Sequence, residues 1–218
     1  MAEKLRGILF DMDGTLLNTL EDLADSTNRS LARLGLPVHA VEAYRYFVGD
    51  GMENLARRVL PADRRDPRMV GEIAEAVSRE YAEHWADKTR LYPGIPVLLD
   101  ALSARKVPMA ILSNKPHAFT LAIAEHYFQR WTFAAVLGAR DTHPRKPDPS
   151  AALEISSALG LPPAGMLYAG DTNTDMQTAS RAGMFPVGVL WGFRDREELL
   201  ANGALVLAER PEDLLRFF

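Results

Sequence analysis

Short apolar runs recur along this chain, and longer stretches with a helical pattern separate them. The runs are Ile8–Phe10, Met109–Leu112, Ala134–Leu137, Met166–Ala169, Val187–Leu190 and Ala204–Leu207. Short β-prone runs that alternate with amphipathic stretches are typical of βα units and a mainly parallel sheet. Parallel strands of one sheet are joined by right-handed crossovers. The pattern therefore predicts an α/β fold with a Rossmann-like open parallel sheet and helices on both faces.

One interval breaks this alternation, because from about residue 17 to residue 90 we find helical periodicity and no convincing strand. The first helix has apolar or small residues at helical spacing, namely Leu20, Leu23, Ala24, Thr27, Leu31 and Leu34, and Gly35 ends it. Asn18 with Glu21 is predicted to cap its start. Further helices are predicted over residues 41–47, 52–60 and 69–86. We therefore predict an α/β core of residues 1–16 and 91–218 and an inserted α-helical cap of residues 17–90, a lid over the edge of the sheet.

Composition restricts the classes of function. The chain is 47% hydrophobic, enough for a sizeable core, and its net charge of −4 gives no electrostatic basis for binding nucleic acid or an anionic membrane. With no cysteine, disulfides, thiolate catalysis and cysteine-based zinc sites are excluded. The apolar run at residues 7–10 is too short for a signal peptide, and no run of about 18 apolar residues occurs. We expect a soluble protein of a reducing, cytoplasmic compartment.

The first apolar run ends in two carboxylates and a glycine, in the sequence Asp11-Met12-Asp13-Gly14-Thr15. A strand with this end offers three groups that phosphate chemistry requires. Asp11 can act as a nucleophile, Asp13 can donate a proton beside it, and Gly14 lets the backbone approach an anion closely. An Asp-Gly turn in a hairpin would explain the same residues. The motif alone does not decide between the two interpretations.

Polar residues also follow later apolar runs. Ser113 and Asn114, directly after Leu112, can hold phosphate oxygens at a strand-to-helix turn, although both are ordinary helix-capping residues. Lys146 lies in a loop that Pro147 and Pro149 stiffen, where it can supply a fixed positive charge. An exposed lysine in a proline-rich turn is the alternative. In open α/β sheets ligands bind outside the carboxyl ends of the strands, which predicts that these residues lie near Asp11.

A second acidic pair, Asp171 and Asp175, follows the run that ends at Ala169. Asp171 is expected at the tip of the strand and Asp175 in the first turn of a helix that Gly183 ends. Together with Asp11, these carboxylates suit a hard cation with oxygen ligands such as Mg²⁺. Capping of the helix N-terminus would explain Asp175, but it explains Asp171 less well.

The order of these groups along the chain is more informative than any one of them. An acidic pair, a hydroxyl, a lysine and a second acidic pair each follow a β-run, and in this order the chain closely resembles the haloacid dehalogenase-like hydrolase superfamily. The resemblance is nearest to its phosphoglycolate-phosphatase-like branch and covers essentially the whole chain, helical insert included. It implies a Mg²⁺-dependent phosphatase, a phosphoric monoester hydrolase that acts on a small phosphate ester such as phosphoglycolate through an aspartyl-phosphate. It also implies that the helical insert is a mobile cap.

By motif, the resemblance implies a role for each of these residues. Asp11 would be the nucleophile and Asp13 the general acid and base. The metal ligands would be Asp11, the main-chain carbonyl of Asp13, Asp171 and Asp175. Contacts with the substrate would come from Thr15, Ser113, Asn114 and Lys146, and from Gly49 and Gly51 of the cap.

Several alternatives stay open. The Asp-Ser pair common after the first motif is Asn18-Thr19 here, where the hinge begins, and this departure bears on the range of substrates. Dehalogenase relatives lack the second aspartate of the first motif, so Asp13 favours phosphoryl transfer. A sugar-phosphate mutase, a pyrophosphatase and a non-catalytic binding protein on the same scaffold are the rival functions. Both monomer and homodimer are compatible with the sequence. Trp191 is the tryptophan expected to approach the site, because it follows a predicted strand.

Overall fold

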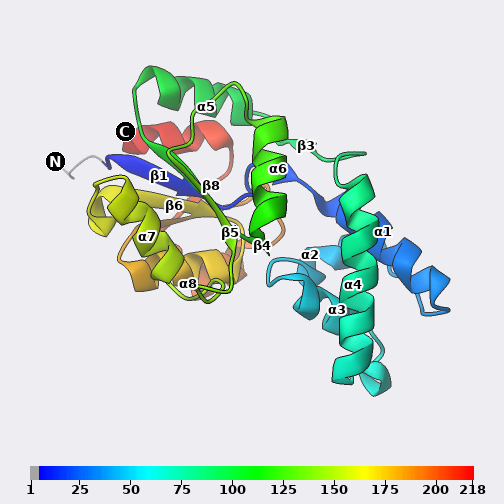
Figure 1. The fold of residues 1–218 in the computed structure, drawn as a ribbon. Coiled ribbons are helices and arrows are strands. Elements are labelled where there is room, and N and C mark those ends of the chain that lie inside the picture. Colours follow the sequence, from blue (N-terminus) through cyan, green and yellow to red (C-terminus); the bar gives the residue numbers. More distant parts are fainter. Residues whose placement is uncertain (1–4) are drawn as a thin grey trace. The chain divides into compact units, whose positions relative to one another are not determined.

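The computed structural model describes residues 5–218, and a six-stranded sheet with the order β5-β4-β1-β6-β7-β8 lies at the centre of its larger unit (Figure 1). Every pairing in this sheet is parallel. The strands are β1 (Gly7–Phe10), β4 (Met109–Pro116), β5 (Ala135–Ala139), β6 (Met166–Gly170), β7 (Phe185–Val189) and β8 (Val206–Ala208). The predicted α/β fold with an open parallel sheet is confirmed.

Helices cover both faces of the sheet. On one face lie α5 (Ile95–Ala104) and the C-terminal 3₁₀ segment Pro211–Phe217, and on the other lie α7 (Ser150–Ala158) and α8 (Asn173–Ala182) (Figure 1). The remaining helices of this unit are α6 (His117–Tyr127) and α9 (Arg196–Ala201). The central strands β1, β4 and β6 are buried on both faces, as parallel strands usually are, which is why they occur in the sequence as continuous apolar runs.

The order of the strands reverses at β1. The strands β4 and β5 extend from one side of it, and β6, β7 and β8 extend from the other. Phe10 at the end of β1 is paired with Ile111 of β4 and with Ala169 of β6. The residues that follow these three strands therefore emerge together at one edge of the sheet, the position where ligands bind in open α/β folds.

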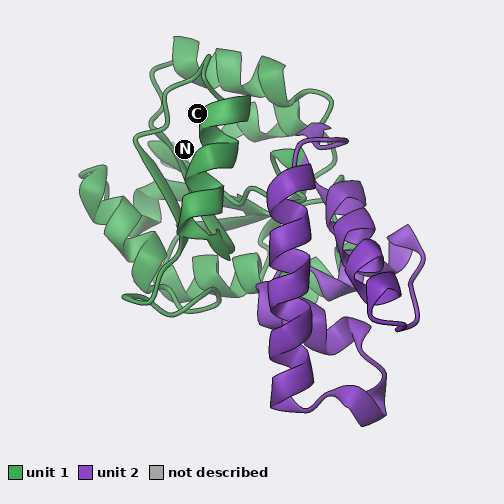
Figure 2. Ribbon diagram, turned by 45° about the vertical axis from the view of Figure 1, so that its right-hand side comes forward, with its two compact units in different colours: residues 1–17, 91–218 green, residues 18–90 purple. Residues whose placement is uncertain are grey.

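Residues 18–90 form a second compact unit, and residues 1–17 and 91–218 form the first (Figure 2). The second unit contains α1 (Leu20–Arg33), α2 (Tyr44–Phe47), α3 (Met52–Val59) and α4 (Pro67–His84), with 3₁₀ turns at Val41–Ala43 and Ala62–Arg64. Within it, α4 packs against both α1 and α3. Across residues 5–218, no helix combines the length and the apolar character needed to cross a bilayer.

Two details of the helical interval differ from the prediction. Two short strands, β2 (Leu17–Asn18) and β3 (Arg90–Leu91), pair with each other at the ends of the interval. Because Asn18 belongs to β2, α1 has Thr19 at its N-cap, with no capping bond from that side chain. The Asn18 side-chain oxygen lies 3.4 Å from the N–H of Leu20, and the predicted cap of Asn18 with Glu21 is wrong. A two-residue strand that pairs with a segment so distant in the chain leaves no periodic signal in the sequence.

Candidate active site

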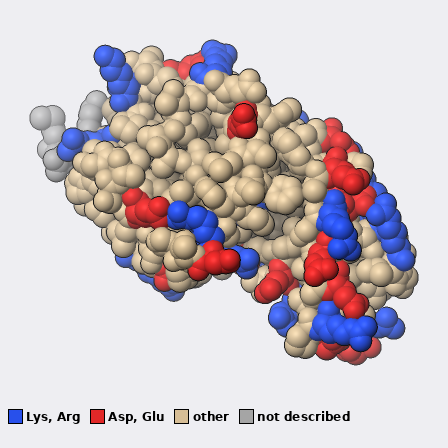
Figure 3. Space-filling view, in the orientation of Figure 1, with Lys and Arg blue, Asp and Glu red and all other residues tan. Residues whose placement is uncertain are grey.

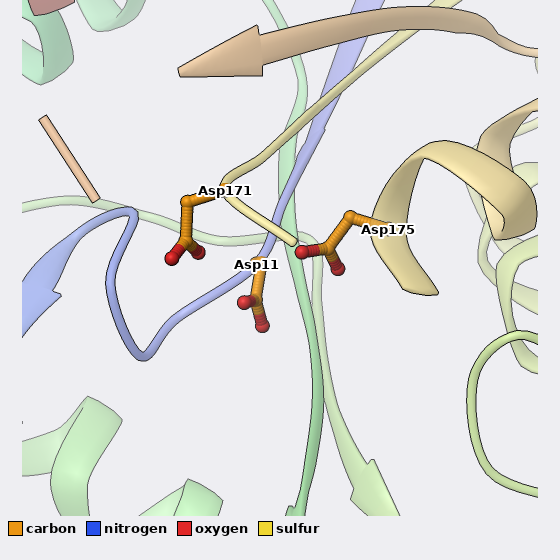
Figure 4. A group of neighbouring side chains, drawn as sticks. All are labelled: Asp11, Asp171 and Asp175. Atoms are coloured by element: carbon orange, nitrogen blue, oxygen red, sulfur yellow. The ribbon is translucent and has the colours of Figure 1, made fainter. Parts of the chain in front are cut away.

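Three buried carboxylates converge at the carboxyl edge of the sheet (Figure 4). Asp11 follows β1, Asp171 follows β6 and Asp175 lies in the first turn of α8. One oxygen atom from each lies within 4.8 Å of the others. As predicted, α8 ends at Gly183, which adopts the left-handed conformation.

The loop after β1 lies directly against Asp171, and Gly14 makes this possible. Gly14 has a φ of +88°, and a Cβ atom at this position would lie 2.2 Å from Oδ2 of Asp171. Any other residue would be strained and would collide with the carboxylate. Thr15, next in the loop, donates its hydroxyl to Asp171 at 2.9 Å, and the main-chain N–H of Phe193 donates to the same carboxylate at 2.8 Å.

Lys146 supplies an ammonium group to this cluster. Its Nζ atom lies 2.8 Å from Oδ1 of Asp11 and 2.7 Å from Oδ1 of Asp175, and its side chain is only 3% exposed. Asn114 holds the main chain of Lys146 in both directions, because Oδ1 accepts from its N–H at 2.8 Å and Nδ2 donates to its carbonyl at 3.2 Å. Lys146 is therefore a buried, fixed charge and not the exposed lysine of a turn.

Asp175 caps α8 and also belongs to the carboxylate cluster. Its Oδ2 atom accepts from the N–H of Thr172 at 3.0 Å and from the hydroxyl of Thr172 at 2.6 Å, which caps α8. Its Oδ1 atom accepts from Lys146 and from the hydroxyl of Tyr168 at 3.2 Å. Helix capping fixes the orientation in which Asp175 joins the cluster.

The cluster has an excess of negative charge. Burial and the neighbouring charge of Asp175 raise the pKa of Asp11 well above its usual range, although Lys146 opposes this shift. Burial and Asp175 also raise the pKa of Asp171 to about 7, against hydrogen bonds from Phe193 and Thr15. For Lys146, burial lowers the pKa, but the charges of Asp11 and Asp175 outweigh burial and raise it, so the ammonium stays charged. Three buried carboxylates, of which two are paired with the single ammonium of Lys146, are a favourable setting for a cation.

Asp13 lies beside this cluster with partners of its own. Its Oδ2 atom lies 3.4 Å from the hydroxyl of Ser113, and its Oδ1 atom lies 3.2 Å from Nζ of Lys115. The sequence interpretation gave Lys115 no role. The sequence did contain a signal that could have placed Lys115 at the site. Lys115 lies two residues after Ser113 in an extended segment, and residues with this spacing point to the same face of a strand.

Ser113 and Asn114 lie in a different element from the one predicted, whereas Trp191 lies where it was expected. Ser113 and Asn114 lie within β4, which continues to Pro116, so neither caps α6 and the predicted strand-to-helix turn at Ser113 is wrong. Trp191 approaches the site as expected, donating its ring N–H to the carbonyl of Thr15 at 2.9 Å.

Gly49 and Gly51 belong to the helical unit, on the loop between α2 and α3. Their φ values are +112° and +87°, and Asp50 between them is paired with Arg58. Their predicted role in binding substrate stays a prediction.

The fold is that of a known class of enzyme. Residues 8–189 match the sequence profile described as haloacid dehalogenase-like hydrolase, and the chain belongs to that family. The phosphoglycolate phosphatase of Pseudomonas putida is 33% identical over 213 residues, which cover 94% of this chain and 74% of that protein. The phosphoglycolate phosphatase of Escherichia coli K12 is 30% identical over 232 residues, which cover 98% of this chain and 92% of that protein.

Solved structures agree with this assignment. A protein of Lactobacillus delbrueckii subsp. bulgaricus, assigned as a phosphoglycolate phosphatase, superposes with a TM-score of 0.92 at 30% identity over 97% of both chains. A haloacid dehalogenase-like protein of Streptococcus pneumoniae has the same fold, with a TM-score of 0.88 at 23% identity over 98% of both chains. The family and its phosphoglycolate-phosphatase-like branch, which the motifs predicted, are thus confirmed.

Proposed function

We propose that this protein is a Mg²⁺-dependent phosphatase that hydrolyses a small phosphomonoester through an aspartyl-phosphate on Asp11. Membership of the family and similarity to curated phosphoglycolate phosphatases indicate a phosphoric monoester hydrolase. Because these relatives are phosphoglycolate phosphatases, phosphoglycolate is the leading candidate for the substrate. A cytoplasmic location, the absence of nucleic acid and membrane partners, and the oligomeric state stay predictions.

The donor set fits a magnesium ion. Carboxylate oxygens are its preferred ligands, and the excess negative charge of the buried cluster requires a cation for full ionisation. Asp11, Asp171, Asp175 and the main-chain carbonyl of Asp13 would hold the ion. When bound, Mg²⁺ would screen the charge of the phosphate group and allow an anionic carboxylate to approach it.

In the first step, a carboxylate oxygen of Asp11 attacks phosphorus. A new P–O bond forms to Asp11 while the bond from phosphorus to the ester oxygen breaks, and Asp13 gives its proton to the leaving alkoxide. Lys146 holds Asp11 in place at 2.8 Å and adds positive charge beside the phosphate.

In the second step, water completes the hydrolysis. Asp13, now a carboxylate, takes a proton from a water molecule as the water oxygen attacks phosphorus. The P–O bond to Asp11 breaks, inorganic phosphate leaves and Asp11 is restored as a carboxylate. The same residue acts as acid and then as base, so the proton balance closes over one cycle.

Phosphate oxygens would be bound by the hydroxyl of Ser113 and by main-chain N–H groups of the loop that follows β1 and of the last residues of β4. The side chains of Thr15 and Asn114 already have partners in Asp171 and Lys146. Any contact of Thr15 or Asn114 with substrate would therefore come from their main-chain atoms. Gly49 and Gly51 would contribute from the cap when it closes, a movement that would exclude water.

The observation that carries this proposal is the buried cluster of three carboxylates around Lys146, with Asp13 beside it. A phosphate-release screen over a panel of phosphomonoesters, with Mg²⁺ and with chelator, tests it. We expect release that depends on Mg²⁺, with phosphoglycolate among the best substrates. Equal release in chelator would contradict the role of the metal, and no release from any ester would contradict the phosphatase.

The same assay separates the rival functions. A hexose 1-phosphate would be returned as an isomer by a mutase, whereas a phosphatase would release inorganic phosphate from it. Inorganic pyrophosphate in the panel would reveal a pyrophosphatase by preferential release.

A further inference from the structure

The pairing of Lys115 with Asp13 has no place in the scheme above. The two side chains are 8% and 16% exposed, and Nζ of Lys115 lies 3.2 Å from Oδ1 of Asp13. That oxygen is buried and makes no hydrogen bond among the described residues, so the ammonium is the group that faces it. The other oxygen, Oδ2, lies beside the hydroxyl of Ser113. The two oxygens of one carboxylate thus have different environments.

A bulge in β4 produces this arrangement. Leu112 is paired with Leu137 of β5, but the next pair is Pro116 with Ala139, so four steps along β4 match two steps along β5. Side chains alternate in the extended segment between these pairs. Ser113 and Lys115 therefore reach Asp13, while Asn114 reaches the main chain of Lys146.

The main chain of Lys115 is itself held in place by close packing. Its carbonyl accepts from the hydroxyl of Thr120 at 3.2 Å. A Cβ atom at Gly138 of β5 would lie 2.6 Å from the carbonyl of Lys115 and 2.3 Å from the hydroxyl of Thr120. Only glycine therefore fits at this position of β5. The stem of Lys115 starts from a fixed point, which gives its ammonium a defined position.

Resting on the proposed function, we infer that Lys115 is a positioning residue that determines which oxygen of Asp13 transfers the proton. Its ammonium holds Oδ1, so Oδ2 carries the proton and faces the phosphate that Ser113 binds. The proton moves from Oδ2 to the ester oxygen as the P–O bond breaks, and a proton from water returns to Oδ2 in the second step. Without Lys115, Asp13 can rotate and present either oxygen, or neither, to the leaving group.

The dependence of rate on the leaving group tests this role. An alkyl phosphomonoester needs a proton as its alkoxide leaves, whereas p-nitrophenolate leaves readily without one. For Lys115→Met we expect kcat/KM, which reports the step that expels the leaving group, to fall by about 10- to 100-fold with the alkyl ester, within the range of general acid catalysis, and by less than about threefold with p-nitrophenyl phosphate. Asp13→Asn should show the same difference between the two esters, with a larger loss on the alkyl ester. Lys106→Met, at an exposed lysine away from the site, is the matched control and should change neither rate.

Each outcome decides the question. An equal loss of kcat/KM on both esters would show a merely structural role for Lys115 and overturn the inference. A rise in KM confined to carboxylated substrates, with kcat unchanged, would make Lys115 a substrate-binding group and overturn it as well. If Lys115→Met does not fold, Lys115→Arg replaces it. We then expect a smaller difference between the two esters in the same direction, and an equal loss of activity on both would contradict the inference. No release by the wild-type enzyme from either ester would instead contradict the proposed phosphatase, and the inference with it.

Discussion

Both units of this protein bury carboxylates, but they neutralise them differently. In the helical unit, Asp22 and Glu80 are buried and each is surrounded by donors. In the α/β unit, Asp11, Asp171 and Asp175 are buried together around a single lysine. The comparison separates carboxylates that stabilise a fold from carboxylates that the fold leaves short of positive charge.

The helical unit satisfies its buried acids completely. Asp22 accepts from the N–H groups of Lys88 and Thr89 and from the Thr89 hydroxyl, at distances of 2.8 to 3.0 Å. Burial alone would raise the pKa of Glu80, but hydrogen bonds from Arg29 and Arg33 outweigh it and hold that pKa below its usual range.

Charge pairing continues on the surface of this unit, where acidic and basic side chains alternate in the face shown in Figure 3. Every one of these contacts lies within one unit, and none requires a ligand.

The α/β unit leaves its acids short of positive charge. Burial and repulsion from neighbouring carboxylates raise the pKa of Asp11 against the opposing charge of Lys146. They also raise the pKa of Asp171 against hydrogen bonds from Phe193 and Thr15 and the charge of Arg194. A fold selected for stability alone would avoid such a cluster, since uncompensated buried charge is costly. The deficit therefore marks the place where a cation and a phosphate group would bind.

The largest expected effect is that of Asp11→Asn. We expect kcat to fall by about 10⁴-fold or more, as for the loss of other nucleophiles, because an amide cannot form the aspartyl-phosphate. The metal-free protein should remain folded, since the change removes one of the repelling charges. Phosphate release and far-UV circular dichroism measure the two effects, with Asp63→Asn at an exposed position of the helical unit as the control. Substantial turnover by Asp11→Asn would show that another residue is the nucleophile.

Lys146→Met tests how much the buried carboxylates depend on their ammonium partner. Removing the ammonium leaves Asp11 and Asp175 buried without their cationic partner, so the free energy of unfolding should fall by about 3–5 kcal/mol. Urea unfolding in chelator measures the loss, and Mg²⁺ should restore part of it. Lys106→Met serves again as the control. A loss below about 1 kcal/mol, the usual value of an exposed ion pair, would mean that the cluster is not short of positive charge.

The two kinds of carboxylate should also differ in pH dependence. Asp171 has a pKa of about 7 in the folded protein against an ordinary value of 3.8, so the folded state binds more protons between these limits. The stability of the metal-free protein should therefore fall as pH rises through this window. The lowered pKa of Glu80 acts in the opposite sense, with stability present above 4.5 and lost as pH falls.

Urea midpoints at about pH 5 and about pH 7, with chelator and with Mg²⁺, measure the slope of this dependence. Asp171→Asn should flatten the slope seen in chelator, and Mg²⁺ should do the same for the unchanged protein. A metal-free protein that becomes more stable over this range would contradict the raised pKa of Asp171.

The smallest expected effect belongs to the satisfied carboxylates. Asp22→Asn should lower the free energy of unfolding by about 1–3 kcal/mol, because the amide nitrogen cannot accept from the N–H groups of Lys88 and Thr89. This loss should be the same with and without Mg²⁺, unlike that of Lys146→Met. Urea unfolding of both variants under both conditions makes the comparison, and a loss that Mg²⁺ reverses would place Asp22 in a ligand site.

Much of the core was predictable because parallel strands buried on both faces leave continuous apolar runs. The runs at 8–10, 109–112 and 166–169 lie within β1, β4 and β6, although β4 continues beyond its run to Pro116. The edge strand β8 was predicted over 204–207 and lies at Val206–Ala208, because the apolar run begins at Ala204 and Leu205, which precede the strand. The pair β2 and β3 was not predictable, because its two segments are distant in the chain and each has only two residues.

The candidate site was likewise predictable only in part from the sequence. The identities and order of Asp11, Asp13, Lys146 and Asp171 along the chain suffice to indicate a phosphoryl-transfer site, since the chemistry depends on residue type and on the strand that each follows. The partners of these residues were not predictable. A side chain's partner depends on which way it points, and that direction is set by strand register and bulges.

The chain alone thus specifies the class of fold, the family and the set of chemical groups, because local periodicity and motif order carry that information. Three-dimensional packing decides how the groups are used. It makes Asp175 both the cap of α8 and a member of the cluster, turns Asn114 toward the main chain of Lys146 and brings Lys115 to Asp13. The contacts of Asn114 with Lys146 and of Lys115 with Asp13 join segments dozens of residues apart, and only the pairing of strands around β1 brings them within hydrogen-bond distance.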